Sequence, residues 1–143
     1  MAKVIFNYAD RIPFFKNKRA IKNFVEQIFE NERKKIKKIN YVFCSDLYLL
    51  EINKKFLRHN YYTDVITFDL SEEKKEIIGE IYISVDRVLD NATHFKCSFP
   101  YELNRVIFHG ALHLCGYDDK TAKKLKIMRD REDYYLHLFH VKR

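Results

Sequence analysis

The sequence predicts an α+β fold in which a single mixed β-sheet of about four strands packs against about five helices. Two observations support this fold class. Segments rich in β-branched and aromatic residues lie in the first 84 residues, whereas helical periodicity dominates the remainder. Hydrophobic residues make up 47% of the chain, including 12 Phe and 10 Tyr, so there is sufficient material for a core. A chain of 143 residues usually forms one core, and we expect a single domain over residues 1–143.

The first part of the chain is expected to alternate strands with helices. β-branched and aromatic residues predict a strand over residues 3–9 and another over residues 40–44. Between them, apolar residues recur at helical spacing over residues 16–32. The apolar face of this helix consists of Ile21, Phe24, Val25 and Ile28. A second helix is predicted over residues 46–56.

The second part is expected to supply two more strands and then mainly helices. Strands are predicted over residues 63–68 and 76–84, the second of them interrupted at Gly79. Helical periodicity returns over residues 86–115, with a pause near a proline that suits the first turn of a new helix. A last helix is predicted over residues 119–137, and its expected core residues are Leu125, Met128, Tyr135 and Leu136.

The composition excludes a membrane-spanning or disulfide-rich protein and favours a cytoplasmic one. No segment approaches the roughly 18 uncharged apolar residues that a transmembrane helix needs. The N-terminal segment MAKVIFNYADR lacks the features of a signal peptide. The cysteines Cys44, Cys97 and Cys115 form no CxxC pair, which is typical of reduced thiols. We therefore expect a cytoplasmic protein with no membrane partner.

The most informative segment is FHGALHLCGYDD, at residues 108–119. Side chains four residues apart lie on one face of an α-helix, so His109 and His113 can direct both imidazoles toward one point. Gly116 is expected to end this helix in a left-handed cap, which reverses the direction of the chain. Two aspartates occupy the returning segment, so that a carboxylate can approach the histidines.

The pattern H-x3-H-x2-G-x2-D supplies two imidazole nitrogens and one carboxylate oxygen. Catalytic zinc sites use three protein ligands and keep a fourth position for water, whereas structural zinc sites are usually closed by four ligands. We therefore predict one divalent ion per chain, zinc or another transition metal, bound by His109, His113 and Asp119. An alternative stays open in which the histidines are core residues and Asp118 or Asp119 caps the last helix.

Longer stretches of the sequence carry a family resemblance. HGALHLCGYDD resembles the HGxLHLxGYDH signature of the YbeY family, metal-dependent endoribonucleases that mature ribosomal RNA. Segments 52–70 and 77–84 resemble two further family segments, and Met128 and Glu132 resemble its terminal helix, so the match covers roughly the last two-thirds of the chain. The resemblance implies a zincin-like metal-binding helix and cleavage of single-stranded RNA, with ribosomal RNA or the small ribosomal subunit as partner. DNA is not expected as a partner.

Two positions depart from the family pattern. The usual third ligand is histidine, and Asp119 stands in its place, where a carboxylate is also an accepted zinc ligand. The family's arginine falls on Leu57, and Arg58 follows one residue later. We predict Arg58 as a catalytic residue that binds phosphate, and Asp118 as the nearest candidate for the general base.

The net charge of +7 favours a polyanionic partner such as RNA. Lysines gather in two places, and the candidate phosphate contacts are Lys34, Lys35, Lys37, Lys38, Lys120, Lys123 and Lys124. Tyr61 and Tyr62 are candidates for stacking on bases.

Two rival functions remain open. A metallopeptidase of the metzincin type has similar ligand spacing, but it needs a glutamate directly after the first histidine, and this chain has Gly110 there. The other rival is a non-catalytic RNA-binding or ribosome-binding assembly factor in which the metal is structural. An absent general base would suit such a binding protein.

Overall fold

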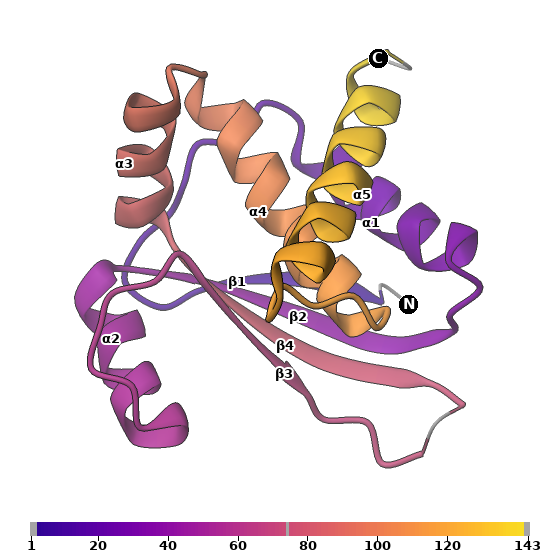
Figure 1. The fold of residues 1–143 in the computed structure, drawn as a ribbon, viewed down its shortest axis with the longest axis horizontal. Helices are drawn as coiled ribbons and strands as arrows, with labels where there is room; N and C mark the ends of the chain where they lie inside the picture. The colour runs from indigo at the N-terminus through magenta and orange to yellow at the C-terminus, as the bar shows by residue number, and fades with distance from the viewer. Residues whose placement is uncertain (1–2, 74, 142–143) are drawn as a thin grey trace.

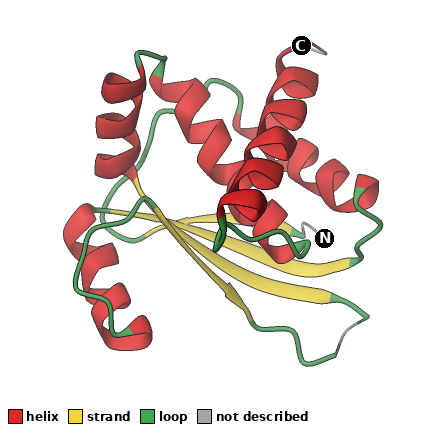
Figure 2. Ribbon diagram, in the orientation of Figure 1, coloured by secondary structure: helices red, strands yellow, loops and turns green. Residues whose placement is uncertain are grey.

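Residues 3–73 and 75–141 are described in the computed structural model, and they form four strands and five helices, as the sequence predicts (Figures 1 and 2). In chain order the elements are β1 (Val4–Tyr8), α1 (Lys18–Asn31), β2 (Ile36–Cys44), α2 (Asp46–Leu57), β3 (Val65–Asp69), β4 (Ile77–Ser84), α3 (Val85–Phe95), α4 (Phe99–Leu114) and α5 (Ala122–Val141). None of these described helices combines the length and the apolar character needed to cross a membrane.

The strands form one mixed sheet in the order β1-β2-β4-β3. β1, β2 and β4 run parallel, whereas β3 runs antiparallel to β4 at one edge of the sheet. Val65 at the start of β3 pairs with Ile83 near the end of β4, and Asp69 pairs with Gly79. The predicted α+β class with a mixed sheet is thus confirmed.

The helices lie on both faces of the sheet. α1 and α4 cover one face and α5 packs on α4, whereas α2 lies on the opposite face (Figure 1). The main core fills the space between the sheet and helices α1, α4 and α5, with Tyr41, Phe43 and Phe108 among its largest buried side chains. A smaller cluster beneath α2 contains Cys44 and Leu49. The helix with the two histidines is therefore packed between the sheet and α5.

Two glycines allow α4 to approach β4 closely. A Cβ atom on Gly110 would lie 2.7 Å from Cγ2 of Ile81, and one on Gly79 would lie 2.4 Å from Cδ1 of Leu114. At distances this short a neighbouring atom must move, so a side chain at either position would force Leu114 or Ile81 to shift. β4 continues through Gly79 without a break, so the predicted interruption is wrong: this glycine accommodates Leu114 and does not end the strand.

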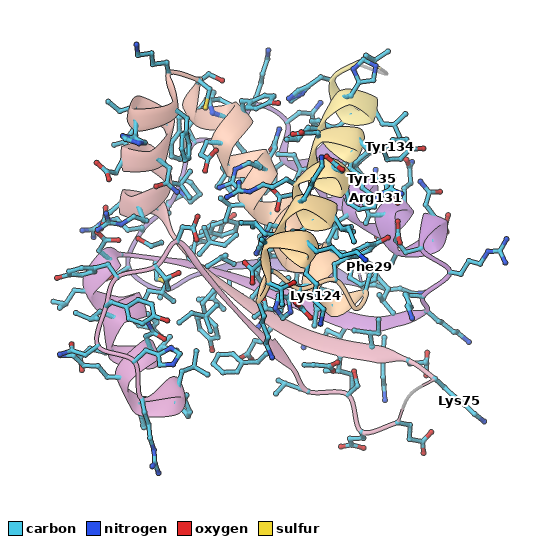
Figure 3. The ribbon with its side chains drawn as sticks, in the orientation of Figure 1. Phe29, Lys75, Lys124, Arg131, Tyr134 and Tyr135 are labelled. Carbon is cyan, nitrogen blue, oxygen red and sulfur yellow. The ribbon has the colours of Figure 1, made fainter. Side chains whose placement is uncertain are left out.

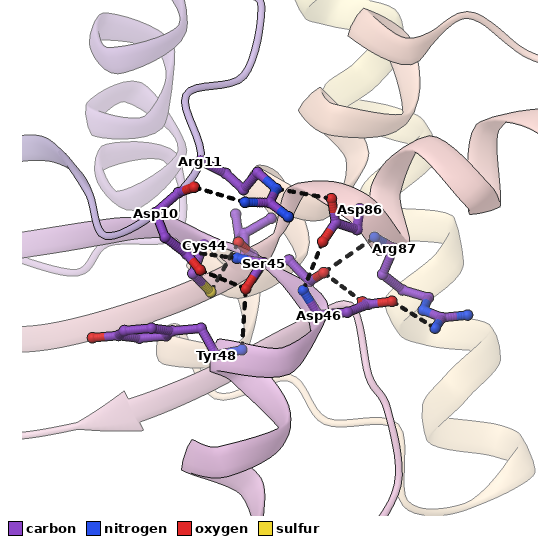
Figure 4. Close-up of polar contacts among 10 residues, drawn as sticks. Asp10, Arg11, Cys44, Ser45, Asp46, Tyr48, Asp86 and Arg87 are labelled. Carbon is purple, nitrogen blue, oxygen red and sulfur yellow. Dashed lines mark hydrogen bonds and ion pairs between the residues drawn. The ribbon is translucent and has the colours of Figure 1, made fainter.

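A polar network ties together the carboxyl ends of the three parallel strands (Figure 4). Asp10, just after β1, accepts hydrogen bonds from the backbone N–H and the hydroxyl of Ser45, at 2.7 and 2.6 Å. Asp86, after β4, accepts from the backbone N–H of Asp46 at 2.9 Å, and Arg87 donates to the Asp46 carboxylate at 2.8 Å. These contacts fix the starts of α2 and α3 relative to the sheet.

The last helix differs from its prediction at both ends. α5 spans Ala122–Val141. Its start follows Thr121, whose hydroxyl accepts a hydrogen bond from the backbone N–H of Lys124 at 3.1 Å and so caps the helix. Leu125 is 38% exposed and does not reach the core, so that expectation is wrong. The buried face begins one turn later, at Met128. Helical spacing identifies a face, but it does not say where along the helix the partner surface begins.

Candidate active site

His109 and His113 lie one turn apart near the end of α4. The helix ends as the sequence predicts, with Gly116 at a positive φ of 110°. Gly116 N–H donates to the carbonyl of His113 and Tyr117 N–H donates to that of Leu112, both at 3.1 Å, which is the hydrogen-bond pattern of a Schellman cap. The cap turns the chain back toward the face of α4 that carries the histidines.

The returning loop is anchored and brings Asp119 to the histidines. The hydroxyl of Tyr117 donates to Glu32 at 2.8 Å, which ties the start of the loop to the end of α1. Oδ2 of Asp119 then lies 3.9 Å from Nε2 of His109. Asp119 thus lies near His109, and the ring centroids of His109 and His113 are 6.4 Å apart.

These residues line a cavity of about 470 Å³. Its walls come from α4, from β3 at the edge of the sheet, from α2 and the segment that follows it, from the loop before α5, and from one residue of α5. The lining residues are Asn53, Leu57, His59, Tyr61, Thr63, Asp64, Val65, Ile66, Thr67, Arg105, Val106, His109, His113, Asp119, Lys120 and Arg129.

Glu132 of α5 fixes the orientation of His109. The Glu132 side chain is only 1% exposed, and its Oε2 lies 2.6 Å from Nδ1 of His109. With Nδ1 held in this way, Nε2 is the nitrogen that remains on the side of Asp119. Burial raises the pKa of Glu132, but the hydrogen bond and charge of His109 and the charge of Arg105 outweigh burial and lower it. Glu132 is therefore an ionised acceptor that orients a potential ligand.

Arg105 braces this carboxylate from the other side. Its guanidinium lies 3.0 Å from Glu132 and 2.5 Å from Glu102, two buried carboxylates, and 3.6 Å from Asp64. Burial lowers the pKa of Arg105, but the hydrogen bond and charge of Glu102, together with Glu132, raise it overall. Arg105 is thus a permanent cation that is fully engaged by protein carboxylates.

His113 is held in the form that a metal requires. Burial, followed by the charge of His109, lowers the pKa of His113 below its ordinary value of 6.5. Near neutral pH its imidazole is therefore uncharged and has a lone pair to offer a metal ion.

The residues present fit a divalent transition metal by their chemistry. Within the described ranges, no three His, Cys, Asp or Glu side chains are already close enough to hold an ion. Two donor atoms about 2.1 Å from a tetrahedral ion lie roughly 3.4 Å apart, and the separation between His109 and Asp119 is 3.9 Å. The Asp119 side chain is 45% exposed on a loop, so a small rotation would close the difference.

The two predicted catalytic residues lie elsewhere. Arg58 is an exposed C-cap of α2 with a left-handed φ of 57°, and the cavity lining includes its neighbours Leu57 and His59 but not Arg58. Asp118 also lies outside the lining. Its carboxylate accepts from the backbone N–H of Lys120 at 3.1 Å and pairs with Lys124 at 3.4 Å.

These contacts leave Asp118 a weak base. The hydrogen bond from the backbone of Lys120, with smaller contributions from Lys124, lowers the pKa of Asp118. Lys124 lies near the start of α5 (Figure 3). Neither Asp118 nor Asp119 caps α5, since Thr121 does, so the proposed capping role for these aspartates is wrong.

Sequence reasoning missed three residues of the cavity region. Glu132 and Arg105 were not singled out as site residues, although a charged residue within a buried helical stripe is a usable signal. Glu132 follows Met128 and precedes Tyr135 on the buried face of α5. Arg129 lines the cavity from an exposed position, and no sequence pattern distinguishes it from other surface arginines.

Known proteins resemble the chain over most of its length. The family model described as "Endoribonuclease YbeY" matches residues 5–140. The Endoribonuclease YbeY of Cytophaga hutchinsonii is 47% identical over 137 residues, which cover 95% of this chain and 96% of the relative. That of Flavobacterium psychrophilum is 52% identical over 120 residues, or 84% of this chain and 85% of the relative.

A solved structure agrees with these relatives. The solution structure of TM1509 from Thermotoga maritima is 30% identical, with a TM-score of 0.64, and the match covers 97% of this chain and 90% of that one. Sequence and fold thus point to the same group of proteins. The chain belongs to the endoribonuclease YbeY family, whose members are hydrolases that cleave phosphodiester bonds in RNA.

Proposed function

We propose that this chain hydrolyses single-stranded RNA with one divalent transition-metal ion, zinc in the first instance, held by His109, His113 and Asp119. The contact of Glu132 with Nδ1 of His109 at 2.6 Å carries this proposal. A histidine that ligates a metal usually donates its other ring N–H to a carboxylate or carbonyl, and that partner fixes the ring. When bound, the ion supplies Lewis acidity at a phosphoryl oxygen and makes water more acidic.

Two exposed cations are suited to bind the RNA backbone at this site. Lys120 and Arg129 both line the cavity, and both are exposed. Arg105 also lines it, but buried carboxylates already engage its guanidinium. We therefore assign phosphate binding to Lys120 and Arg129 and a positioning role to Arg105. Arg58 remains a candidate only if the α2–β3 segment moves on binding.

The peptidase alternative lacks support at one position. A glutamate in place of Gly110 would have to serve as general base. Gly110 instead faces β4, where even a Cβ atom would meet Ile81 at 2.7 Å. The backbone therefore leaves no room for a catalytic side chain there.

The proposed partners are ribosomal RNA and the small ribosomal subunit, and the proposed location is the cytoplasm, where both occur. The net charge of +7 supports a polyanionic substrate. Cleavage of small subunits, protein-free ribosomal RNA, unrelated single-stranded RNA and DNA should be compared under one condition. Preferential cleavage of the ribosomal substrates is expected, and equal cleavage of DNA would contradict this assignment.

The central test combines metal analysis with RNA cleavage. Purified protein should contain close to one equivalent of a divalent transition metal and should cut a labelled single-stranded RNA. A chelator and the substitution His113→Ala should each abolish cleavage, whereas His94→Ala, at an exposed histidine of α3, should not. RNA binding without cleavage under any metal would support a passive binding factor, and peptide hydrolysis without RNA cleavage would support a peptidase.

The third ligand is tested by a pair of substitutions. Asp119→Ala should weaken metal affinity strongly, because it removes the carboxylate nearest to Nε2 of His109. Asp118→Ala should leave metal affinity nearly unchanged. If only Asp118→Ala releases the ion, the third ligand is Asp118, and the loop rearranges on metal binding.

A further inference from the structure

Two stacked aromatic rings lie in the wall of the cavity that the segment after α2 supplies. The rings of His59 and Tyr61 are stacked, with centroids 5.1 Å apart and planes inclined by 20°. The hydroxyl of Tyr61 lies 2.9 Å from Nδ1 of His59, which ties the two rings together. Both residues line the cavity that contains His109 and His113.

A buried side chain holds this pair in place. Asn53 of α2 is 2% exposed, and its Nδ2 donates to the carbonyl of Tyr61 at 2.9 Å. The carbonyl of Asn53 accepts from the backbone N–H of His59 at 3.1 Å. Arg58, which precedes His59, adopts a left-handed conformation that is unfavourable for a residue with a Cβ. The two hydrogen bonds of Asn53 stabilise the chain around it. The segment that carries the two rings is thus preorganised.

The Tyr61 ring is not placed there to fill the core. Tyr61 is 56% exposed and belongs to neither buried cluster. Because Tyr61 also lines the cavity, its exposed ring is accessible to a ligand that enters there. The adjacent Tyr62 differs, since the guanidinium of Arg87 lies over its ring at 5.4 Å and it does not line the cavity.

The rest of the cavity determines which ligand suits this surface. Lys120 and Arg129 supply positive charge in the same cavity. A stacking surface beside cations is the combination that proteins use for single-stranded nucleic acid, because every base has a flat face and every nucleotide a phosphate. A peptide would need an extended set of hydrogen-bond partners or apolar pockets.

We propose that His59 and Tyr61 form a nucleobase-binding subsite, in which the base of a nucleotide adjacent to the scissile phosphate stacks on the free face of the Tyr61 ring. The subsite rests on the proposed RNA cleavage and specifies how the substrate is held. It acts by binding, so it sets the register of the strand in the cavity and makes no contact with the reacting atoms.

The first test is kinetic. Tyr61→Ala should raise KM for a single-stranded RNA about 5- to 150-fold, the range expected for loss of one base–aromatic stack. Tyr61→Phe keeps the ring and should change KM by less than about threefold. The control is Tyr134→Ala, because Tyr134 is similarly exposed but lies on α5 away from the cavity (Figure 3). An unchanged KM in folded Tyr61→Ala would overturn the subsite.

The second test changes the substrate and needs no protein variant. A set of oligonucleotides carries one abasic nucleotide at each position near the cleavage point. The wild-type protein should lose affinity at one position by the same factor as Tyr61→Ala loses it on intact RNA, and Tyr61→Ala should be insensitive at that position. Equal tolerance of an abasic nucleotide at every position would overturn the proposal, even if the alanine variant failed to fold.

The third test separates this subsite from the cleavage chemistry. RNA that carries 2-aminopurine at the identified position should lose fluorescence when it binds protein with His113→Ala, and the loss should disappear when Tyr61→Ala is added. This test requires no cleavage. If the wild-type protein quenches the fluorescence but does not cleave RNA, the subsite is upheld and the proposed catalysis is contradicted. Cleavage by wild type without quenching at any position would do the reverse.

Discussion

Glu132 shows how one buried charge can prepare a ligand. Burying a carboxylate is unfavourable unless its charge is paired, and this one contacts both His109 at 2.6 Å and Arg105 at 3.0 Å. The same contacts select which ring nitrogen of His109 faces the cavity. Glu132 thus stabilises the contact between α4 and α5 and also orients the imidazole.

The substitution Glu132→Gln tests this role. Glutamine keeps the size of the side chain but removes its charge, so His109 is held less firmly and metal affinity should fall about 10- to 100-fold. Metal titration by calorimetry measures the change. Asp130→Asn, at an exposed carboxylate of the same helix, serves as the control. An unchanged dissociation constant in well-folded Glu132→Gln would show that the carboxylate has only a structural role.

Acid should destabilise the metal-free protein through His113. Its folded-state pKa lies below the ordinary value of 6.5, so the unfolded chain takes up a proton first as the pH falls. The contribution of neutral His113 is fully present above pH 6.5 and is lost as the pH falls through its folded-state pKa. Thermal melts from about pH 7.5 to 5.5 should therefore show less pH dependence in His113→Gln than in wild type. Parallel curves for the two proteins would contradict this.

At this scale the sequence predicts part of the site. The spacing of His109 and His113 determines their common helix face, and Gly116 predicts the reversal that returns Asp119. The contact between His109 and Glu132 joins residues 23 positions apart on two helices, and no local pattern determines such packing. The position of Arg58 follows from counting residues back from Thr63. Its left-handed backbone conformation, which directs the side chain, does not follow from the sequence.

The contact between α4 and β4 sets the distance of the helix with the two histidines from the sheet. Gly110 follows the first histidine directly, and at this position the helix packs against Ile81 of β4. Any side chain at this position would lift the helix and move both histidines relative to β3. The glycine is thus required for packing at the centre of the motif.

Gly110→Ala should destabilise the metal-free protein by about 1–3 kcal/mol, the usual cost of overpacking a core. Denaturant unfolding measures this cost. Ile81→Ala removes Cγ2, the atom that the new methyl group would meet at 2.7 Å. The double variant should therefore be more stable than the sum of the two single effects predicts. Strict additivity would show that the two residues are not in contact.

The elements with strong periodicity are the ones that the sequence predicts well. The helix around Ile21, Phe24 and Val25 and the strands around Tyr41 and Ile81 follow their patterns, because burial on one face imposes the period. The errors lie where a partner element decides the outcome. Gly79 weakens a strand in isolation, but here it makes room for Leu114 of another element.

For the molecule as a whole, the net charge of +7 attracts RNA, but charges near the cavity should matter most. Screening limits the reach of an exposed charge to about 10 Å at ordinary ionic strength. Lys120 lines the cavity, whereas Lys75 precedes β4 at the far end of the β3–β4 hairpin (Figure 3). The sequence places Lys120, but not Lys75, among the candidate phosphate contacts, and the cavity lining supports that choice.

RNA affinity measured over a range of salt should rank them. Lys120→Ala should weaken binding and reduce the slope of log affinity against log salt by about 0.7, the value for one phosphate contact on a single strand. Lys75→Ala removes the same charge and should leave the slope unchanged. Equal changes in affinity and salt slope in the two variants would mean that RNA binding depends only on the net charge of the protein.

The contact between His109 and Glu132 also depends on the order in which the chain is synthesised. A ribosome makes the chain from its N-terminus, so the histidines are synthesised before the carboxylate that lies 23 residues further along. Until α5 has emerged and docked, the imidazole lacks its partner and Arg105 lacks one of its anchors. The contact that orients His109 is therefore completed only after residue 132 has been made, so the geometry of His109 depends on the last helix of the chain.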